Sequence, residues 1–122
     1  MGNPNTIWGY TDRLVATSSL QSDVNGSFVI NLPAVSSGEV WRVMGVCVYR
    51  DTNAGQYARV TIVYSGGSTS IEDISMPATG KLYPSISELV LKAVDNIRVT
   101  YVGATIGETV ITSAWGYKMT VP

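Results

Sequence analysis

Hydrophobic and polar residues alternate along most of this chain in short runs that are typical of β-strands. Successive side chains of a strand point to opposite faces, so a run with apolar residues at every second position predicts a strand with one buried face. No window keeps the spacing of an amphipathic helix for three turns, and the strand-favouring residues Val, Ile and Thr are abundant. The eight predicted strands are Leu14–Leu20, Ser27–Leu32, Glu39–Arg50, Tyr57–Tyr64, Ser70–Met76, Glu88–Ala93, Asn96–Val102 and Thr109–Val121.

The alternation also predicts which side chains face the core. In the last run, Thr109–Val121, Trp115 and Tyr117 are predicted to face inward, and Ala114 and Gly116 outward. Strands with one polar face favour antiparallel sheets over a parallel α/β core. We therefore expect an all-β fold, a single antiparallel β-sandwich of about eight strands.

The run Glu39–Arg50 differs, because after Glu39 both of its faces are apolar apart from Arg42 and Arg50. Two interpretations fit this pattern. Gly45 marks a β-bulge that reverses the inward face midway, or the strand is central and a neighbouring subunit covers its outer face. We favour the bulge.

Three short polar sequences predict turns between these strands. Asn25-Gly26 is typical of a two-residue hairpin, because its turn type needs positive φ at both central residues. Ser65–Ser68 and Asp95-Asn96 are the second and third predicted turns.

Length and composition limit the number of domains and exclude several kinds of catalytic and metal site. The 122 residues predict one domain, divided into an N-terminal arm at residues 1–10 and a sandwich at residues 11–122. The chain has no His, which excludes imidazole bases and His metal ligands. It has one Cys, which excludes an intrachain disulfide and a Cys-based zinc site.

Charge and hydropathy limit the partners further. Charged residues make up 14% of the chain and the net charge is −1, so no basic stripe is available for nucleic acid. We see no signal peptide and no apolar stretch long enough to span a membrane. No nucleic-acid or membrane partner is expected.

The candidate catalytic groups do not combine into a site. Cys47 lies between two Val in a strand, and we expect a buried, unreactive thiol. Glu72-Asp73 is the only adjacent pair of acids, and neighbours on a strand point to opposite faces unless a bulge intervenes. We therefore expect neither an enzyme nor a cofactor.

Asp51 and Asn53 form a weak candidate for a calcium site. They are two residues apart and Gly55 follows, as in loops that supply oxygen ligands, but the downstream Glu of such loops is missing. The favoured interpretation is a hairpin loop in which both side chains brace turns. No metal is therefore expected.

The aromatic residues divide into two groups. Trp8 and Tyr10 lie in a segment flanked by Gly, Pro and Asn, outside any predicted strand. Such side chains either fold back over the sandwich or anchor on another chain. Trp41 and Trp115, in contrast, are predicted in the core.

Two parts of the chain resemble small virion proteins of tailed bacteriophages. The first is Ser36–Val43 followed by Val46–Arg50, and the second is Thr109–Lys118, which is similar to the final strand of capsid or collar components. This resemblance implies a jelly-roll or related sandwich that decorates, cements or connects parts of a phage particle, often as a trimer. It implies no catalytic residue.

The first hypothesis is therefore a non-enzymatic structural protein of a virus particle. It would assemble in the host cytoplasm as a homo-oligomer, with a trimer favoured, and bind the major capsid protein or another virion protein. Contacts would come from the arm and the sheet edges. The partner-binding residues would be Ile7, Trp8 and Tyr10 in the arm, followed by Arg42 and Tyr49.

The second hypothesis is a carbohydrate- or receptor-binding sandwich, such as a fibre head or a lectin-like module. It predicts exposed aromatic side chains beside polar loop residues, and allows calcium at Asp51 and Asn53. A small enzyme is the third and weakest hypothesis, because the chain has no His.

Overall fold

The computed structural model describes the backbone of residues 10–121 and the side chains of residues 12–121. Within this range the protein contains strands and no helix, so the all-β prediction is confirmed. Every predicted strand is present, and a ninth, of two residues, lies between the fifth and sixth predicted strands. The strands are β1 (Tyr10–Gln21), β2 (Gly26–Asn31), β3 (Glu39–Arg50), β4 (Gln56–Tyr64), β5 (Gly67–Met76), β6 (Tyr83–Pro84), β7 (Leu89–Lys92), β8 (Asn96–Ala104) and β9 (Thr109–Thr120).

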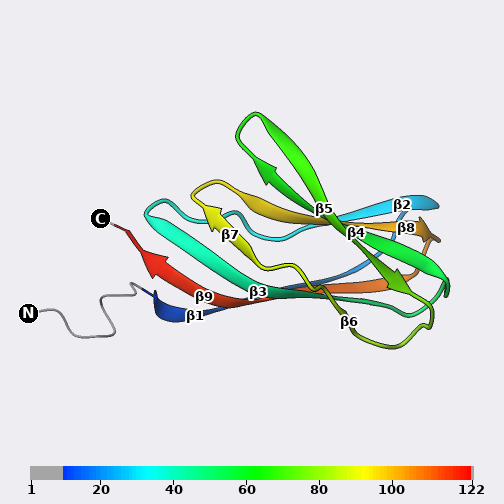
Figure 1. Cartoon of the computed structure of the whole chain (residues 1–122). Helices are drawn as coiled ribbons and strands as arrows, with labels where there is room; N and C mark the ends of the chain where they lie inside the picture. The colour runs from blue at the N-terminus through cyan, green and yellow to red at the C-terminus, as the bar shows by residue number, and fades with distance from the viewer. Residues whose placement is uncertain (1–9, 122) are drawn as a thin grey trace, which may run out of the picture.

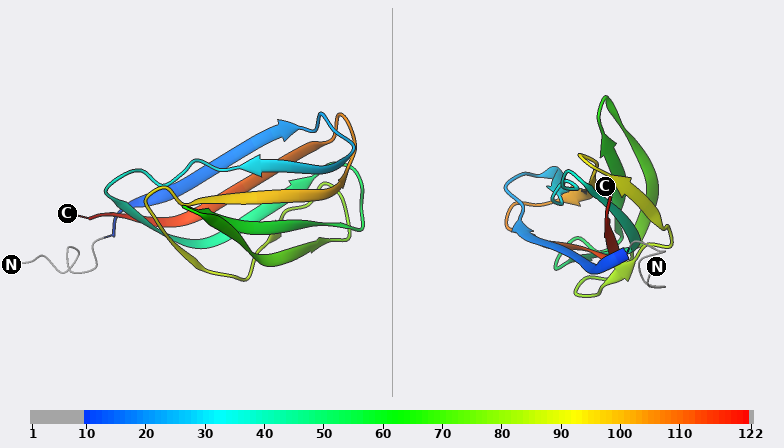
Figure 2. Two further views of the ribbon diagram at one scale, coloured as in Figure 1. Left: turned by 90° about the horizontal axis from the view of Figure 1, so that it is seen from above. Right: turned by 90° about the vertical axis from the view of Figure 1, so that its left-hand side faces the viewer.

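The strands form two antiparallel sheets that pack face to face (Figure 1). Sheet A has the order β1-β9-β3, with β6 and β7 both paired to β3, and sheet B has the order β2-β8-β4-β5. When β6 and β7 are counted as halves of one broken strand, this order is that of a jelly roll, which is built from two Greek keys. Figure 2 shows β1 and β2, the edge strands of the two sheets, along the same side of the sandwich.

The core lies between the sheets and is filled by the alternating inward residues of each strand. On β8 these are Ile97, Val99 and Tyr101, as predicted, and all three are buried. Burying such side chains is the main favourable contribution to folding, at about 25 cal/mol per Å² of apolar surface. The remaining core residues include Ile30, Val43, Val46, Val48, Val60, Met76, Leu91 and Val110.

The predicted bulge in β3 is present. The register between β3 and β9 shifts between Val43 and Gly45. Trp41 and Val43 face the core before the shift, and Val46 and Val48 face it afterwards. The bulge therefore reverses the inward face midway, and the core position predicted for Trp41 is confirmed.

The inward face predicted for β9 is wrong. Ala114 and Gly116 face the core, whereas Trp115 and Tyr117 are about half exposed on the outside. The core at this point admits only small residues, because a Cβ at Gly116 would collide with the backbone carbonyl of Arg42.

A polar core residue of β9 explains why hydrophobicity misled the prediction. Thr112 is fully buried, and its Oγ1 lies 2.8 Å from the hydroxyl of the buried Tyr101. The same hydroxyl donates a hydrogen bond of 2.7 Å to the Ile111 carbonyl. A satisfied polar group is tolerated inside, so the apolar face of β9 is not its buried face.

Two of the three predicted turns do not form hairpins. Asn25-Gly26 lies between β1 in sheet A and β2 in sheet B, and Asp95-Asn96 lies between β7 in sheet A and β8 in sheet B. Only Ser65–Ser68 closes a hairpin, with Tyr64 paired to Gly67. The turn residues indicated correctly where these strands end, but they did not indicate which strands pair with one another.

The predicted N-terminal arm is largely outside the described residues. Ile7 and Trp8 belong to that part, so their partner-binding role stays a prediction. Tyr10 is the first residue of β1 and pairs through its backbone with Met119 of β9.

Candidate functional site

The outer face of sheet A carries an exposed group of aromatic, apolar and basic side chains. The outer patch, as we call it, consists of Arg13 and Val15 on β1, Arg42 on β3, and Trp115 and Tyr117 on β9. Val15 is 66% exposed, Trp115 49% and Tyr117 51%. Large apolar side chains that share one sheet face in this way are typical of an interaction surface.

Strand register places the members of the outer patch next to one another. Tyr117 lies directly opposite Arg13 on one side and Arg42 on the other. Trp115 lies opposite Val15 of β1 and Gly45 of β3 in the same way. Directly opposed residues have Cβ atoms about 4.5–5.5 Å apart, so these side chains form two adjacent rows across three strands.

Gly45 provides the space in which the Trp115 side chain lies. A Cβ at this glycine would be 2.8 Å from the indole Nε1, which is closer than real contacts allow. The indole therefore covers the backbone at the β3 bulge while half of its surface stays in solvent. Contact with the bulge restricts the ring, which lowers the entropy lost when a partner binds to it.

The positive charge of Arg42, on the β3 side of the outer patch, is partly balanced by a nearby carboxylate. The Arg42 guanidinium lies 3.3 Å from the Glu88 carboxylate, and both side chains are about half exposed. Val90 of β7 is opposite Arg42 and is also exposed. An exposed ion pair of this kind contributes little to stability, so both groups can exchange partners.

The structure places two of the predicted partner-binding residues on the same outer face of sheet A, although they lie far apart along β3. Arg42 and Tyr49 are seven residues apart, and a regular strand would place their side chains on opposite faces. The bulge removes this difference, so both point outward from sheet A, on the faces opposite Val43 and Val48. The alternation along β9 did not predict that Trp115 and Tyr117 would lie on this outer face.

Cys47 also lies on this outer side of β3, opposite Ser113 of β9. Its side chain is half-buried rather than buried, so the predicted burial is only partly correct.

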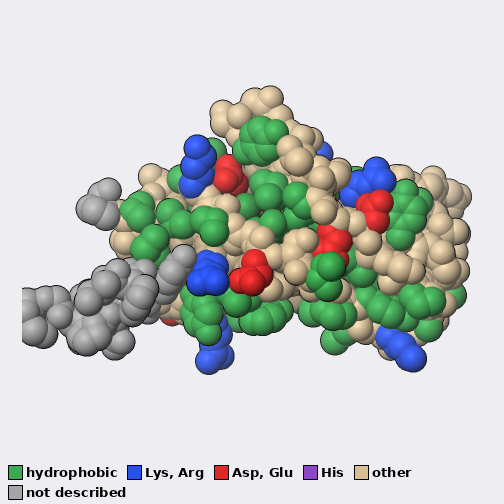
Figure 3. Space-filling view, in the orientation of Figure 1, with side chains coloured by type: hydrophobic (Ala, Val, Ile, Leu, Met, Phe, Trp, Pro, Cys, Tyr) green, Lys and Arg blue, Asp and Glu red, His purple; other side chains and the backbone are tan. Residues whose placement is uncertain are grey.

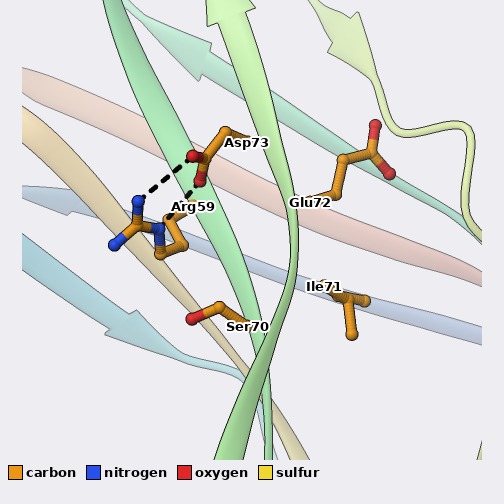
Figure 4. Close-up of a pocket in the computed structure, with 5 residues that line it drawn as sticks. All are labelled: Arg59, Ser70, Ile71, Glu72 and Asp73. Carbon is orange, nitrogen blue, oxygen red and sulfur yellow. Dashed lines mark hydrogen bonds and ion pairs between the residues drawn. The ribbon is translucent and has the colours of Figure 1, made fainter.

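A shallow hollow of about 270 Å³ lies on sheet B and is lined by Arg59, Ser70, Ile71, Glu72 and Asp73. Figure 4 shows that Arg59 and Asp73 point toward each other on one side of β5 and that Glu72 points to the other side. A bulge at Ile71 interrupts the register with β4 but does not bring the two carboxylates together.

Each acid of the hollow already has a structural partner. Arg59 donates two hydrogen bonds to Asp73, of 2.8 and 3.1 Å, and this bonding lowers the pKa of the Asp73 carboxyl. Glu72 accepts hydrogen bonds from the backbone amides of Ile86 and Ser87, at 3.1–3.2 Å. Neither carboxylate has the free, converging geometry that acid–base chemistry requires.

A buried ion pair joins β3 to the loop before β9. Neither Arg50 nor Glu108 has an exposed side chain, and Thr52 donates a further hydrogen bond of 3.0 Å to Glu108. Burial alone would raise the pKa of Glu108, but hydrogen bonding and the charge of Arg50 outweigh it and lower the pKa. Burial raises the pKa of neighbouring Tyr101 to about 12. These groups are enclosed by the fold and serve its stability.

The weak calcium candidate has its polar atoms engaged in bracing the loop. The Asp51 carboxylate accepts a hydrogen bond of 2.9 Å from the Thr109 amide. Asn53 donates from Nδ2 to the hydroxyls of Thr52 and Thr105, at 3.2 and 3.1 Å. No group of three or more acidic or Cys side chains with metal-binding geometry occurs among residues 12–121.

Figure 3 shows the flank of the sandwich on which β5, β6 and β7 lie. Apolar side chains cover much of it, and several of the charged groups lie in pairs of opposite sign. Between the end of β5 and the end of β7, three large apolar side chains are exposed, namely Leu82, Ile86 and Val90. No helix long enough to cross a membrane is present in the described part of the chain.

No protein-family model and no curated protein matches this sequence. Among solved structures, the fold is similar to that of a chain in the acid-stable capsid of the Helicobacter pylori bacteriophage KHP30, with a TM-score of 0.59 and 16% identity over 88% of this chain and 89% of that one. A chain of the Bacillus endospore appendages matches with a TM-score of 0.44 and 18% identity, over 93% and 94% of the two chains. A family 4 carbohydrate-binding module (CBM4) matches at 0.40 and 11%, over 84% and 83%. At these identities the comparisons establish the sandwich fold alone.

Proposed function

We propose that this protein is a non-enzymatic structural component of a virus particle that binds another virion protein through the outer patch. The observation that carries the proposal is a pair of adjacent cross-strand rows on an exposed sheet face, one with Tyr117 between Arg13 and Arg42, the other with Trp115 between Val15 and Gly45. Trp, Tyr and Arg are the residue types that dominate the binding energy of protein interfaces. The predicted arm and the sheet edges would add contacts around this centre.

The jelly-roll topology supports this role. Viral capsid proteins and lectins are two classes that use this fold. The phage KHP30 capsid chain has a similar fold over nearly the whole length of both proteins. A fold alone does not fix a function, so the proposal depends on the outer patch, and the capsid likeness adds to it.

The absence of catalytic equipment supports a binding role over an enzymatic one. The sequence has no His, and Glu72, Asp73 and Glu108 are each held by hydrogen bonds within the fold. The outer patch offers aromatic surface and two guanidinium groups, which bind and orient a partner without transferring protons.

The proposed location is the virion, with assembly in the host cytoplasm. A reducing compartment suits a chain whose single Cys cannot form an intrachain disulfide. The proposed partner is the major capsid protein or another virion protein, and the protein itself would form a homo-oligomer. The net charge of −1 and the scattered basic residues give no reason to add a nucleic acid to the partners.

Analysis of particle composition tests this proposal. Particles of the virus that encodes the chain would be purified by density gradient, and their proteins quantified by mass spectrometry. A fixed copy number of this chain relative to the major capsid protein supports the proposal. Its absence from particles that contain every other structural protein contradicts it.

Binding of a carbohydrate or receptor is the second candidate function. It is favoured by the half-exposed Trp115, whose face could stack on a sugar ring beside the polar pair Arg42 and Glu88. Glycan-array binding that disappears in Trp115→Ala, with Tyr64→Ala as a control for an exposed aromatic elsewhere, would favour this candidate over the first.

A further inference from the structure

Strand β1 is an edge strand with a long, regular side that no other strand of the described residues pairs with. Its other side pairs with β9 along its whole length. Its register with β9 is uninterrupted from Asp12 to Gln21. A straight edge of this length presents a row of backbone N–H and C=O groups to its surroundings.

The hydrogen-bond pattern identifies which residues present those groups. The Ser22 amide donates a hydrogen bond of 2.8 Å to the Glu108 carbonyl, in the same register as the β1–β9 ladder. Residues of an antiparallel strand point their backbone groups alternately toward and away from the neighbour. Counting back from Ser22, the residues that point away from β9 are Arg13, Val15, Thr17, Ser19 and Gln21.

The other sheet edges are protected and β1 is not. Strand β2 has only six residues, and β6 and β7 interrupt the far edge of sheet A. Strand β5 has a bulge and two acidic residues. From Leu14 to Gln21, β1 has no charge, no Pro and no bulge. Monomeric proteins use such devices to prevent edge pairing, so their absence here indicates an edge that has a partner.

We propose that the partner is the β1 strand of a second copy of this chain, paired antiparallel about a two-fold axis at Thr17. This inference rests on the proposed assembly role and names one of its contacts. Thr17 is the middle one of the five residues whose backbone groups point away from β9. A two-fold axis at Thr17 therefore pairs all five within the part of β1 that has an uninterrupted register. An axis nearer the start of β1 would extend the pairing into the register shift before Asp12. An axis nearer its end would leave fewer residues of the strand paired.

Side chains across this pairing are compatible. Arg13 would lie opposite Gln21 and Val15 opposite Ser19 on the outer side, so no like charges face each other. On the inner side Leu14 would lie opposite Leu20. The Leu20 side chain is 47% exposed in the single chain, and this contact would cover part of it.

The geometry of the contact limits its size. A two-fold contact uses the same edge of both copies, so it closes at a dimer and does not extend into a filament. The two sheets A would form one continuous sheet, and the two outer patches would lie on the same side of it. Two linked patches raise the apparent affinity for a surface with repeated sites, such as a capsid lattice.

Site-specific cross-linking tests the pairing. In a Cys47→Ser background of the full chain, Thr17→Cys places two thiols opposite each other, with Cα atoms about 5.5 Å apart, which lies within the range of disulfide geometry. The matched control is Ser19→Cys, because its two copies would be about 13 Å apart along the strands. Rapid disulfide-linked dimer formation with Thr17→Cys and none with Ser19→Cys is the expected result. Equal cross-linking, or cross-linking in neither, would overturn the proposal.

Light scattering gives an independent measurement. The Thr17 N–H points away from β9, so Thr17→Pro should keep the sandwich folded, as circular dichroism would show, and convert a dimer into a monomer. A wild-type chain that is already monomeric would overturn the edge pairing alone. A chain that dimerises through β1 but never occurs on virus particles would contradict the proposed function and leave the pairing intact.

Discussion

Arg50 and Glu108 are joined by two parallel hydrogen bonds at a site from which solvent is excluded. Nε of Arg50 donates to Oε2 of Glu108 at 3.0 Å, and Nη2 donates to Oε1 at 2.8 Å. The remaining Nη1 donates to the Val102 carbonyl at 3.0 Å, and the guanidinium lies 5.7 Å from the centre of the Tyr101 ring. The pair ties the end of β3 to β8 and to the loop before β9, and thereby links the two sheets.

Removing one partner of this pair should strongly destabilise the protein. Glu108→Gln would leave the buried guanidinium without a counter-charge, and we expect a loss of about 3–5 kcal/mol in the free energy of unfolding. Urea denaturation followed by circular dichroism measures this loss. The exposed pair Arg59–Asp73 provides the control, because Asp73→Asn should change stability little. Similar losses in the two variants would contradict the structural role of the buried pair.

The same pair predicts a dependence of stability on pH. The pKa of Glu108 is lowered in the folded protein, so its stabilisation is complete above the ordinary Glu pKa of 4.5. It is lost as the pH falls through the lowered value of the folded state, where the carboxylate takes up a proton. Thermal unfolding at a series of acidic pH values should therefore show a steeper decline for the wild type than for Glu108→Gln. Parallel curves for the two proteins would rule out this origin.

Trp41 and Trp115 should differ sharply in their contribution to stability. Trp41 is buried, and Trp41→Ala should cost about 3–5 kcal/mol through the loss of packing. Trp115 is half exposed, and Trp115→Ala should cost roughly 1 kcal/mol or less, because surface changes rarely cost more. Chemical denaturation of the two variants compares these losses. A large loss for Trp115→Ala would contradict its exposed position and would favour the core position that the sequence pattern predicted.

Most of the fold could be predicted from the sequence because the alternation of apolar and polar residues determines strands directly. The bulge at Gly45 could also be inferred, since β3 is apolar on both faces. Strand β6 could not, because two residues give no pattern. The hairpin predicted at Asn25-Gly26 failed because turn residues fix where a strand ends, whereas the choice of sheet depends on contacts distant in sequence.

The candidate site was predictable only in part. Arg42 was predicted to bind a partner and belongs to the outer patch, whereas Tyr49 shares its face of sheet A, through the β3 bulge, but lies outside the patch. Trp115 and Tyr117 were assigned to the core because they alternate with Ala114 and Gly116, and the more apolar face of the run was expected to be the buried one. What excludes them is the close approach of Gly116 to the β3 backbone, which no local pattern in β9 reveals.

Two glycines should respond differently to the addition of a methyl group. Gly116→Ala places a Cβ against the backbone of Arg42, which cannot move without separating β3 from β9. For Gly45→Ala the three atoms nearest to the new Cβ all belong to the Trp115 side chain, which can turn into solvent. We expect Gly116→Ala to cost at least the roughly 1–3 kcal/mol of an overpacked core, and Gly45→Ala to cost less. The free energies of unfolding from urea titrations compare them.

A double-mutant cycle sharpens this comparison. The cost of Gly45→Ala should largely disappear in a Trp115→Ala background, because the closest contacts of the new Cβ are all with the indole. The cost of Gly116→Ala should be unchanged in the same background. A cost of Gly45→Ala that persists without the indole would contradict the contact between these residues.

The most direct test of the proposed role is binding of the purified chain to particles that lack it. Particles of the encoding virus would be produced from a genome with this gene deleted, incubated with the chain, and analysed by co-sedimentation. We predict saturable binding by the wild type, a loss of at least tenfold in affinity for Trp115→Ser, and wild-type affinity for the exposed control Tyr64→Ser. Binding that is absent, or that is the same for Trp115→Ser and the wild type, would contradict a docking role for the outer patch.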